Sequence, residues 1–215
     1  MKQTYFTAAS IQQVAGEMLT ELADFRQKRP RPFISQVSAL LVLDMQKYFL
    51  QADSHAYLPS APAIVPGINR LVQSYTGQGL PVVFTQHVNT AQNAGMMGSW
   101  WHDLIVEDSP LSQITGELDP SCSILIKKNQ YDAFYKTDLA KLLSAWAIKQ
   151  VVICGVMTHL CCETTARSAF VHGFEVFFTI DGTATYREDF HRATLLNLAH
   201  GVATPVLVDQ ILAQL

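Results

Sequence analysis

Residues 37–43 read Val-Ser-Ala-Leu-Leu-Val-Leu, and Asp44 follows this run at once. A continuous apolar run of this length, rather than an alternating one, is typical of a strand that is buried on both faces of a parallel sheet. Further short apolar runs occupy residues 81–85, 123–127, 150–155, 174–180 and 205–208. The stretch therefore predicts the first strand of a parallel sheet.

Helical segments separate these predicted strands. They are expected at residues 61–75, 137–146, 159–172 and 188–199, with a short helix at 111–115 and a helical turn after the last strand. Strands that alternate with helices predict an α/β fold with right-handed crossovers, in which helices cover both faces of a mostly parallel sheet.

A helical arm precedes the sheet. Its apolar residues recur three and four positions apart: Ile11, Val14, Met18, Leu22 and Phe25. This spacing predicts an amphipathic helix over residues 8–28, and Arg-Pro-Arg-Pro at 29–32 ends it. The chain is therefore divided into an arm, 1–32, and a larger domain, 33–215. We expect the arm to pack onto the domain, because an isolated helix is only marginally stable in water.

The composition excludes several classes of protein. Of 215 residues, 49% are hydrophobic and 15% are charged, with a formal net charge of −3. This combination excludes a mainly disordered chain. The chain has 15 basic and 18 acidic residues without a basic run, which argues against nucleic acid and against a membrane as partners.

The cysteines and the chain's first residues predict a cytoplasmic protein. Four cysteines, at positions 122, 154, 161 and 162, show no pairing pattern, so free thiols in a reducing compartment are expected. No apolar run reaches the roughly 18 residues that a membrane-spanning helix needs. The opening residues, MKQTYFTAASIQQ, lack the apolar stretch of a secretory signal.

Reactive side chains lie at three predicted strand ends. Asp44 ends the first strand, Lys127 and Lys128 end the third, and Cys161 and Cys162 open the helix after the fourth. Ligands bind beyond the carboxyl ends of parallel strands, so an acid, a base and a thiol are expected in one crevice. Each also has an ordinary alternative: a capping aspartate, a solvated lysine, a packed cysteine.

Together these groups suit acyl transfer. A helix N-terminus and a nearby ammonium group lower the pKa of a thiol, and the thiolate is the nucleophile. Backbone amides at the helix start stabilise an oxyanion, while a carboxylate takes the thiol proton and returns it to a leaving amine. The pattern therefore predicts hydrolysis of an amide or a related C–N bond.

Three separated motifs carry a family resemblance. They are Leu-Val-Leu-Asp-Met-Gln-Lys-Tyr-Phe at 41–49, Lys-Asn-Gln-Tyr-Asp-Ala-Phe at 128–134 and Gly-Val-Met-Thr-His-Leu-Cys at 155–161. They resemble the isochorismatase-like cysteine hydrolases, and the resemblance runs from about residue 36 to 208. It implies an enzyme with a three-layer αβα, Rossmann-like fold and a mostly parallel sheet of about six strands.

The resemblance also implies a catalytic Asp-Lys-Cys triad. By position, Asp44 is the acid/base, Lys128 is the lysine and Cys161 is the nucleophile. Lys127 then points the opposite way, because side chains alternate along a strand. The resemblance further implies a cis peptide bond before Met157, and an oxyanion hole made by the backbone amides of Met157 and Cys161.

Two alternatives to an amidase stay open. Isochorismatases, which cleave a vinyl ether, resemble this chain at Asp-Met-Gln-Lys-Tyr-Phe, 44–49, but carry glycine where Cys161 stands. The thiol therefore favours covalent hydrolysis of an amide or ureide through a thioester. Isochorismate hydrolysis and a non-catalytic family member are the alternatives. Cys162 is expected to pack in the core.

No cofactor or metal is expected. Nicotinamidases of the same superfamily bind a metal through Asp-x-His and a second histidine. Asp53-Ser-His55 matches Asp-x-His but follows Asp44 too closely. His87 with Asn89 is a second place for a metal, but a polar histidine that lines the pocket is the favoured interpretation there. No Gly-x-Gly-x-x-Gly follows the first strand, which argues against a dinucleotide.

We expect a pocket for a small-molecule substrate that is flat or partly apolar. Its predicted lining is Gln46, Phe49, His87, Trp101, Tyr131 and Phe134. Residues 95–103, Gly-Met-Met-Gly-Ser-Trp-Trp-His-Asp, predict either a lid over this pocket or a subunit interface. The low charged fraction favours a homodimer or homotetramer.

Overall fold

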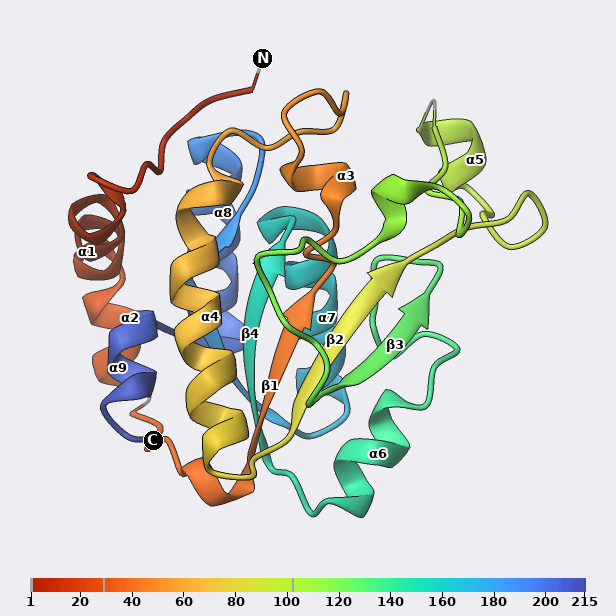
Figure 1. The fold of residues 1–215 in the computed structure, drawn as a ribbon. Helices are drawn as coiled ribbons and strands as arrows, with labels where there is room; N and C mark the ends of the chain where they lie inside the picture. Colours follow the sequence, from red (N-terminus) through yellow and green to blue (C-terminus); the bar gives the residue numbers. More distant parts are fainter. Residues whose placement is uncertain (1, 29, 102) are drawn as a thin grey trace.

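The computed structural model describes residues 2–28, 30–101 and 103–215, and a parallel sheet of six strands forms its middle layer (Figure 1). The strands lie in the order β3-β2-β1-β4-β5-β6. Their bounds are β1 (Ser38–Leu43), β2 (Val82–His87), β3 (Ile124–Lys128), β4 (Gln150–Val156), β5 (Glu175–Ala184) and β6 (Ala203–Val206). Each overlaps a predicted apolar run, although β5 continues well beyond the predicted end at residue 180 and β6 begins two residues before the run predicted at 205–208.

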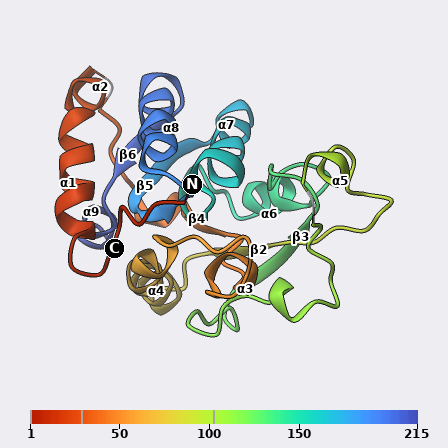
Figure 2. The same cartoon turned by 90° about the horizontal axis from the view of Figure 1, so that it is seen from above.

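Helices cover both faces of this sheet, which confirms the three-layer αβα fold (Figure 2). One face carries α4 (Ala61–Gly77) and α9 (Val208–Leu212). The other carries α6 (Leu139–Ala145), α7 (Glu163–Val171) and α8 (Glu188–Gly201). Every residue of β1 and β4 is buried, as a continuous apolar run predicts for a strand covered on both faces.

The helical arm is two helices instead of the single predicted one. They are α1 (Ile11–Glu21) and α2 (Ala23–Lys28), which stand toward the β6 edge (Figures 1 and 2). The break falls at Leu22, whose N–H donates to the Leu19 carbonyl in a tighter turn, and whose side chain is buried. Periodicity alone did not show this break, because the apolar spacing continues across it.

Several short elements were not predicted or were predicted as regular helix. α3 (Lys47–Leu50) and α5 (Met97–Trp100) are single turns. 3₁₀ turns occupy Ser35–Val37 and Pro110–Ser112, the second of them where a short helix was expected. A π-helical turn, Thr158–Cys162, replaces the start of the helix predicted over 159–172. Elements of three to five residues are too short to show a period.

The strand order places a crevice between β1 and β4, at the carboxyl ends of the strands. β1 lies between β2 and β4, so successive strands are added first on one side of β1 and then on the other. Gly155 of β4 pairs with Leu43 of β1, has φ +115°, and approaches so closely that a Cβ atom would lie 2.1 Å from the Leu43 carbonyl oxygen. Glycine therefore permits the close contact of the two strands beside the crevice.

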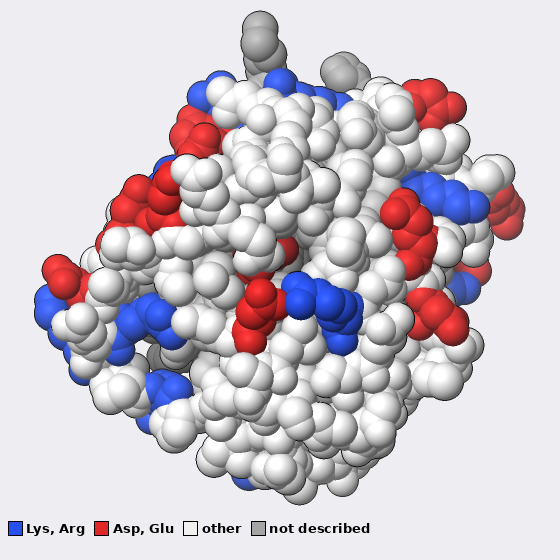
Figure 3. All heavy atoms as spheres, turned by 60° about the vertical axis from the view of Figure 1, so that its left-hand side comes forward, with Lys and Arg blue, Asp and Glu red and all other residues white. Residues whose placement is uncertain are grey.

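The surface carries charges of both signs. On the face in Figure 3, Lys and Arg occur among Asp and Glu, and much of the face is uncharged. Within the described part of the chain, no helix has the length and apolar character needed to cross a membrane.

Candidate active site

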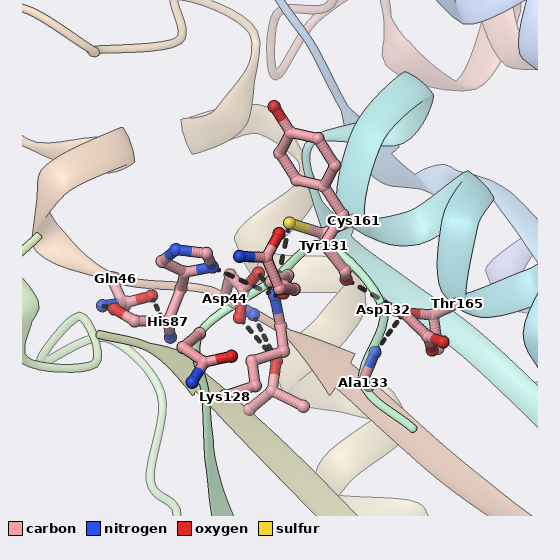
Figure 4. A network of polar contacts seen from close by, with 12 residues as sticks. Asp44, Gln46, His87, Lys128, Tyr131, Asp132, Ala133, Cys161 and Thr165 are labelled. Atoms are coloured by element: carbon pink, nitrogen blue, oxygen red, sulfur yellow. Dashed lines mark hydrogen bonds and ion pairs between the residues drawn. The ribbon is translucent and has the colours of Figure 1, made fainter. Parts of the chain in front are cut away.

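Asp44, Lys128 and Cys161 meet at the carboxyl ends of the strands (Figure 4). The Lys128 Nζ atom lies 2.7 Å from Asp44 Oδ2 and 3.3 Å from Cys161 Sγ. The thiol also contacts the Asp44 carboxylate. The side chains of Asp44 and Lys128 are 0% exposed. The three residues predicted from three different strand ends therefore form one contiguous group.

Asp44 is held by the neighbouring strand β2. It follows β1 with φ +50°, a left-handed conformation that aspartate tolerates. Thr85 donates its hydroxyl to Asp44 Oδ1 at 2.6 Å, and its Oγ1 accepts the Asp44 N–H at 3.1 Å. One carboxylate oxygen is thus fixed by Thr85 while the other faces Lys128. Thr85 is missing from the predicted site, although it lies two residues before His87 and so on the same face of β2.

Lys128 ends β3 with its side chain turned inward. Lys127 points the other way, is half exposed and pairs with Glu107, as strand alternation predicts. The Lys128 ammonium also donates to the Gln130 carbonyl at 2.9 Å. Its charge is therefore paired and hydrogen-bonded although it is buried, which is the condition for keeping a buried lysine charged.

Cys161 lies on the π-helical turn that follows β4. The Val156–Met157 peptide bond is cis, as the resemblance implies. The N–H groups of Leu160 and Cys162 donate to the Met157 carbonyl at 3.1 and 3.2 Å and fold the turn onto itself. Met157 and Cys161 both line the adjoining cavity. The oxyanion role of their backbone amides stays a prediction.

The three groups differ in their preferred charge. Burial raises the pKa of the Cys161 thiol, and the Asp44 carboxylate beside it raises it further, against the opposing effect of Lys128. Burial alone would raise the pKa of Asp44 and lower that of Lys128, but each charge favours the other, so the pKa of Asp44 is lowered and that of Lys128 is raised. The resting group is a carboxylate, an ammonium and a neutral thiol.

This charge state corrects one expectation. A helix start and a lysine were expected to lower the pKa of the nucleophile, but burial and the neighbouring carboxylate outweigh Lys128. Cys161 is instead a thiol in contact with a base. Asp44 is the group that can take its proton as the sulfur attacks.

A cavity of about 280 Å³ adjoins the thiol. Its aromatic walls are Tyr48, Phe49, Trp101, Tyr131 and Tyr186. His87 also lines it, so four residues of the predicted pocket, Phe49, His87, Trp101 and Tyr131, do border the cavity. Trp101 Nε1 donates to the Tyr131 hydroxyl at 2.8 Å and joins the segment after α5 to the loop after β3. A wall of this kind suits a small, flat substrate.

Two predicted pocket residues do not line this cavity. Gln46 is fully buried, and its Nε2 donates to the carbonyls of His87 and Ser112 at 2.9 and 2.8 Å while its Oε1 accepts the His87 N–H. Its amide is consumed in holding backbone segments together. Phe134 stacks on His172, with ring centroids 4.8 Å apart, and belongs to the core behind the site.

The family of the chain follows from comparison with known proteins. A family model, the Isochorismatase domain, matches residues 38–210. The chain belongs to the isochorismatase family. The chain is similar to Nicotinamidase 3 of Arabidopsis thaliana. The two are 38% identical over 190 residues, which are 86% of this chain and 92% of the relative. Isochorismatase of Bacillus subtilis (strain 168) is 27% identical over 83% of this chain and 58% of its own length.

Solved structures share the fold of the chain. A cysteine hydrolase from Pseudomonas syringae pv. phaseolicola 1448A shares the fold with a TM-score of 0.82 at 23% identity, covering 86% of this chain and 94% of that one. A pyrazinamidase of Pyrococcus horikoshii, solved in complex with zinc, has a TM-score of 0.72 at 26% identity, covering 80% and 99%. The enzyme class that the motifs implied, an isochorismatase-family hydrolase, is confirmed.

A zinc-bound neighbour raises the question whether this isochorismatase-family hydrolase has a metal site. Among the described residues, ligand atoms of Asp44, His87 and Cys161 lie within 4.8 Å of one another. The Lys128 Nζ atom lies among them, 2.7 Å from the carboxylate, 3.3 Å from the sulfur and 3.4 Å from His87 Nδ1. A buried ammonium at the centre of the cluster repels a cation, so this donor set does not fit a metal.

His87 itself is engaged on both ring nitrogens. Asn89 donates its Nδ2 to the Asn129 carbonyl at 2.9 Å, so its Oδ1 is the acceptor that faces His87 Nε2 at 2.8 Å. His87 therefore carries its proton on Nε2, and its Nδ1 faces the Lys128 ammonium. Burial lowers the pKa of His87 to about 4, with Lys128 adding to the effect, so the ring is neutral. His87 lines the cavity as a neutral polar side chain, which is the position that the sequence predicted for it.

Proposed function

We propose that this hydrolase is a cysteine amidase that cleaves the C–N bond of a small, flat carboxamide through a thioester on Cys161. The observation that supports the proposal is the buried contact of Asp44, Lys128 and Cys161 at the floor of an aromatic cavity. A neutral thiol beside an ionised carboxylate is the ground state that such a reaction needs.

The proposed first half-reaction transfers the acyl group to the enzyme. Asp44 takes the Cys161 proton as the sulfur attacks the carbonyl carbon, and the backbone amides of Met157 and Cys161 receive the negative oxygen. When the tetrahedral adduct collapses, Asp44 gives the proton to the nitrogen as the C–N bond breaks. Ammonia leaves and the thioester remains.

The second half-reaction restores the enzyme with water. Asp44, again a carboxylate, takes a proton from the water molecule that attacks the thioester carbon. The C–S bond breaks, the sulfur regains a proton and the carboxylic acid is released. Lys128 stays charged throughout, because it is paired with Asp44 in the resting state and keeps the carboxylate in place. The net reaction is a carboxamide plus water to a carboxylic acid plus ammonia.

Nicotinamide is the first substrate to test. It is flat and aromatic, which suits the aromatic walls of the cavity, and a relative with 38% identity is named a nicotinamidase. Other small carboxamides and ureides follow. The vinyl-ether alternative is tested in parallel with isochorismate, because a relative with 27% identity is named an isochorismatase.

The test compares two neighbouring cysteines. Cys161→Ala should lower the rate of ammonia release at least about a thousandfold, since it removes the nucleophile. Cys162→Ala is the matched control, because Cys162 is also buried and is not among the residues that line the cavity. It should retain turnover. Peptide mass spectrometry of quenched wild-type enzyme should find the substrate's acyl group on Cys161.

Two outcomes contradict the proposal. Turnover of a carboxamide by Cys161→Ala rules out the covalent route. Turnover of isochorismate by the wild type and by Cys161→Ala, without carboxamide hydrolysis, establishes the vinyl-ether activity in its place.

A further inference from the structure

The first described residues cross the end of the sheet at which the strands finish (Figures 1 and 2). Residues 2–6, which we call the N-terminal strap, lie outside the 38–210 match of the family model. Their backbone is tied down: the N–H groups of Tyr5 and Phe6 both donate to Ser60 Oγ, at 3.0 and 3.1 Å. The strap is therefore a fixed part of the molecule next to the candidate active site.

The strap joins two walls of the aromatic cavity. The Gln3 N–H donates to the Tyr186 carbonyl at 2.8 Å. The Lys2 ammonium lies 5.1 Å from the centre of the Tyr186 ring and donates to the His55 carbonyl. Tyr186 and His55 both line the cavity but come from chain segments far apart in the sequence.

Tyr5 carries the strap into the interior. Its hydroxyl oxygen accepts the Thr185 N–H at 2.9 Å and lies 2.9 Å from His191 Nδ1. Burial raises the pKa of Tyr5, so the phenol keeps its proton, and burial lowers the pKa of His191 to about 3, so the imidazole is neutral. The two neutral groups therefore share one hydrogen bond, in which the His191 tautomer sets the direction.

This contact reaches the turn that bears the nucleophile. His191 Nδ1 also lies 3.2 Å from the hydroxyl of Thr158, the first residue of the π-helical turn that ends beyond Cys161. The side chain of Thr185, whose N–H binds Tyr5, lies 2.6 Å from His159 Nδ1 in the same turn. The Tyr5 hydroxyl is thus connected to the turn by two routes, one through His191 and one through Thr185. Thr158, Thr185 and His191 are all fully buried.

We propose that Tyr5 is a positioning residue for hydrolysis at Cys161, acting through His191 and Thr185 on the turn Thr158–Cys162. The inference rests on the proposed function. Without the hydroxyl, a buried N–H loses its acceptor and a buried imidazole nitrogen loses a hydrogen-bond partner. The turn can then shift, and small displacements of a nucleophile and its oxyanion donors lower the rate of the chemical step more than the binding of substrate.

Tyr5→Phe tests this role, with Tyr75→Phe as its matched control. Tyr75 is also a buried tyrosine, and its hydroxyl lies 2.9 Å from Ser38 Oγ, near the amino end of β1 and away from the site. Tyr5→Phe should lower kcat for carboxamide hydrolysis about tenfold and change KM less than about twofold. Tyr75→Phe should change neither. Urea unfolding measures the free energy of unfolding of both variants, so that a difference in kcat can be separated from a difference in stability.

A second measurement needs no substrate. Hydrogen–deuterium exchange of backbone amides in residues 157–162 should be faster in Tyr5→Phe than in wild type, and unchanged in Tyr75→Phe. An unchanged kcat overturns the inference whatever the exchange shows. If the wild type hydrolyses no carboxamide, the proposed function fails, and exchange alone then decides: unchanged protection of the turn overturns the role of Tyr5.

Discussion

Among single residues, Lys128 has the sharpest energetic signature. It forms an ion pair with Asp44 in which both side chains are fully buried. Lys128→Met leaves the Asp44 charge without its partner, so we expect the free energy of unfolding to fall by about 3–5 kcal/mol and turnover to be lost. Urea unfolding measures the first effect. Lys127→Met is the control, because that lysine is half exposed and its substitution should cost no more than about 0.5 kcal/mol. Equal stability of the two variants would contradict the buried pair.

The same residues predict an unusual pH profile. The lowered pKa of Asp44 means that its stabilising charge is present above the ordinary carboxyl range and is lost only as pH falls through the lowered value. The raised pKa of Lys128 means that its contribution is lost only as pH rises through that raised value. The thiol pKa is raised as well, and His87, with a pKa of about 4, stays neutral.

We therefore expect kcat/KM to be flat between about pH 5 and 9, since the shifts just described move all four of these groups out of that window. Initial rates of ammonia release across this range measure it, and a substrate without a titrating group keeps the comparison clean. A limb with a midpoint between pH 6 and 8 would show that a histidine or an activated thiolate controls the rate instead.

At the scale of elements, the contact between β1 and β4 decides whether the site forms. Gly155→Ala places a Cβ atom 2.1 Å from the Leu43 carbonyl oxygen and 2.6 Å from its nitrogen, at φ +115°. The Cβ atom would meet backbone atoms of a buried strand, which cannot move aside as a flexible side chain can. We therefore expect the free energy of unfolding, measured with urea, to fall by more than about 4 kcal/mol, or no folded protein to form. Gly16→Ala is the control: it has open space in the middle of α1 and should stabilise the protein by about 0.5–1 kcal/mol. Similar unfolding midpoints for both variants would contradict this.

Elements of ordinary length were predictable from their apolar pattern, and single turns were not. The strand runs and the reactive residues after them predicted that Asp44, Lys128 and Cys161 meet, because carboxyl ends of parallel strands share one edge. The roles of Gln46 and Phe134 were wrong, since a motif fixes position along the chain and not the direction of a side chain in a loop. The contacts of Thr85 and Tyr5 could not be predicted, because their partners are far away in the sequence and are brought near only by folding.

For the whole molecule, the helical arm and the domain share one core. Large apolar side chains of the arm are buried in the same cluster as the sheet: Tyr5, Phe6, Ile11, Met18 and Leu22. Burial of one such side chain contributes about 1.5–3 kcal/mol. Five of them together are comparable to the total stability of a typical domain, about 5–15 kcal/mol. The arm is therefore expected to fold with the domain and not beside it.

This shared core predicts the outcome of truncation. The chain of residues 33–215 should show no cooperative thermal transition by circular dichroism, whereas the full chain should unfold in a single transition. Removal of residues 1–4 is the matched control: it keeps Tyr5 and Phe6 in the core and gives up polar contacts of Lys2 and Gln3, so the fold should survive. A cooperative transition of 33–215 near the full-length midpoint would mean that the arm is a separate appendage. In that case the burial of its apolar face would have little effect on the stability of the sheet that holds Asp44, Lys128 and Cys161 together.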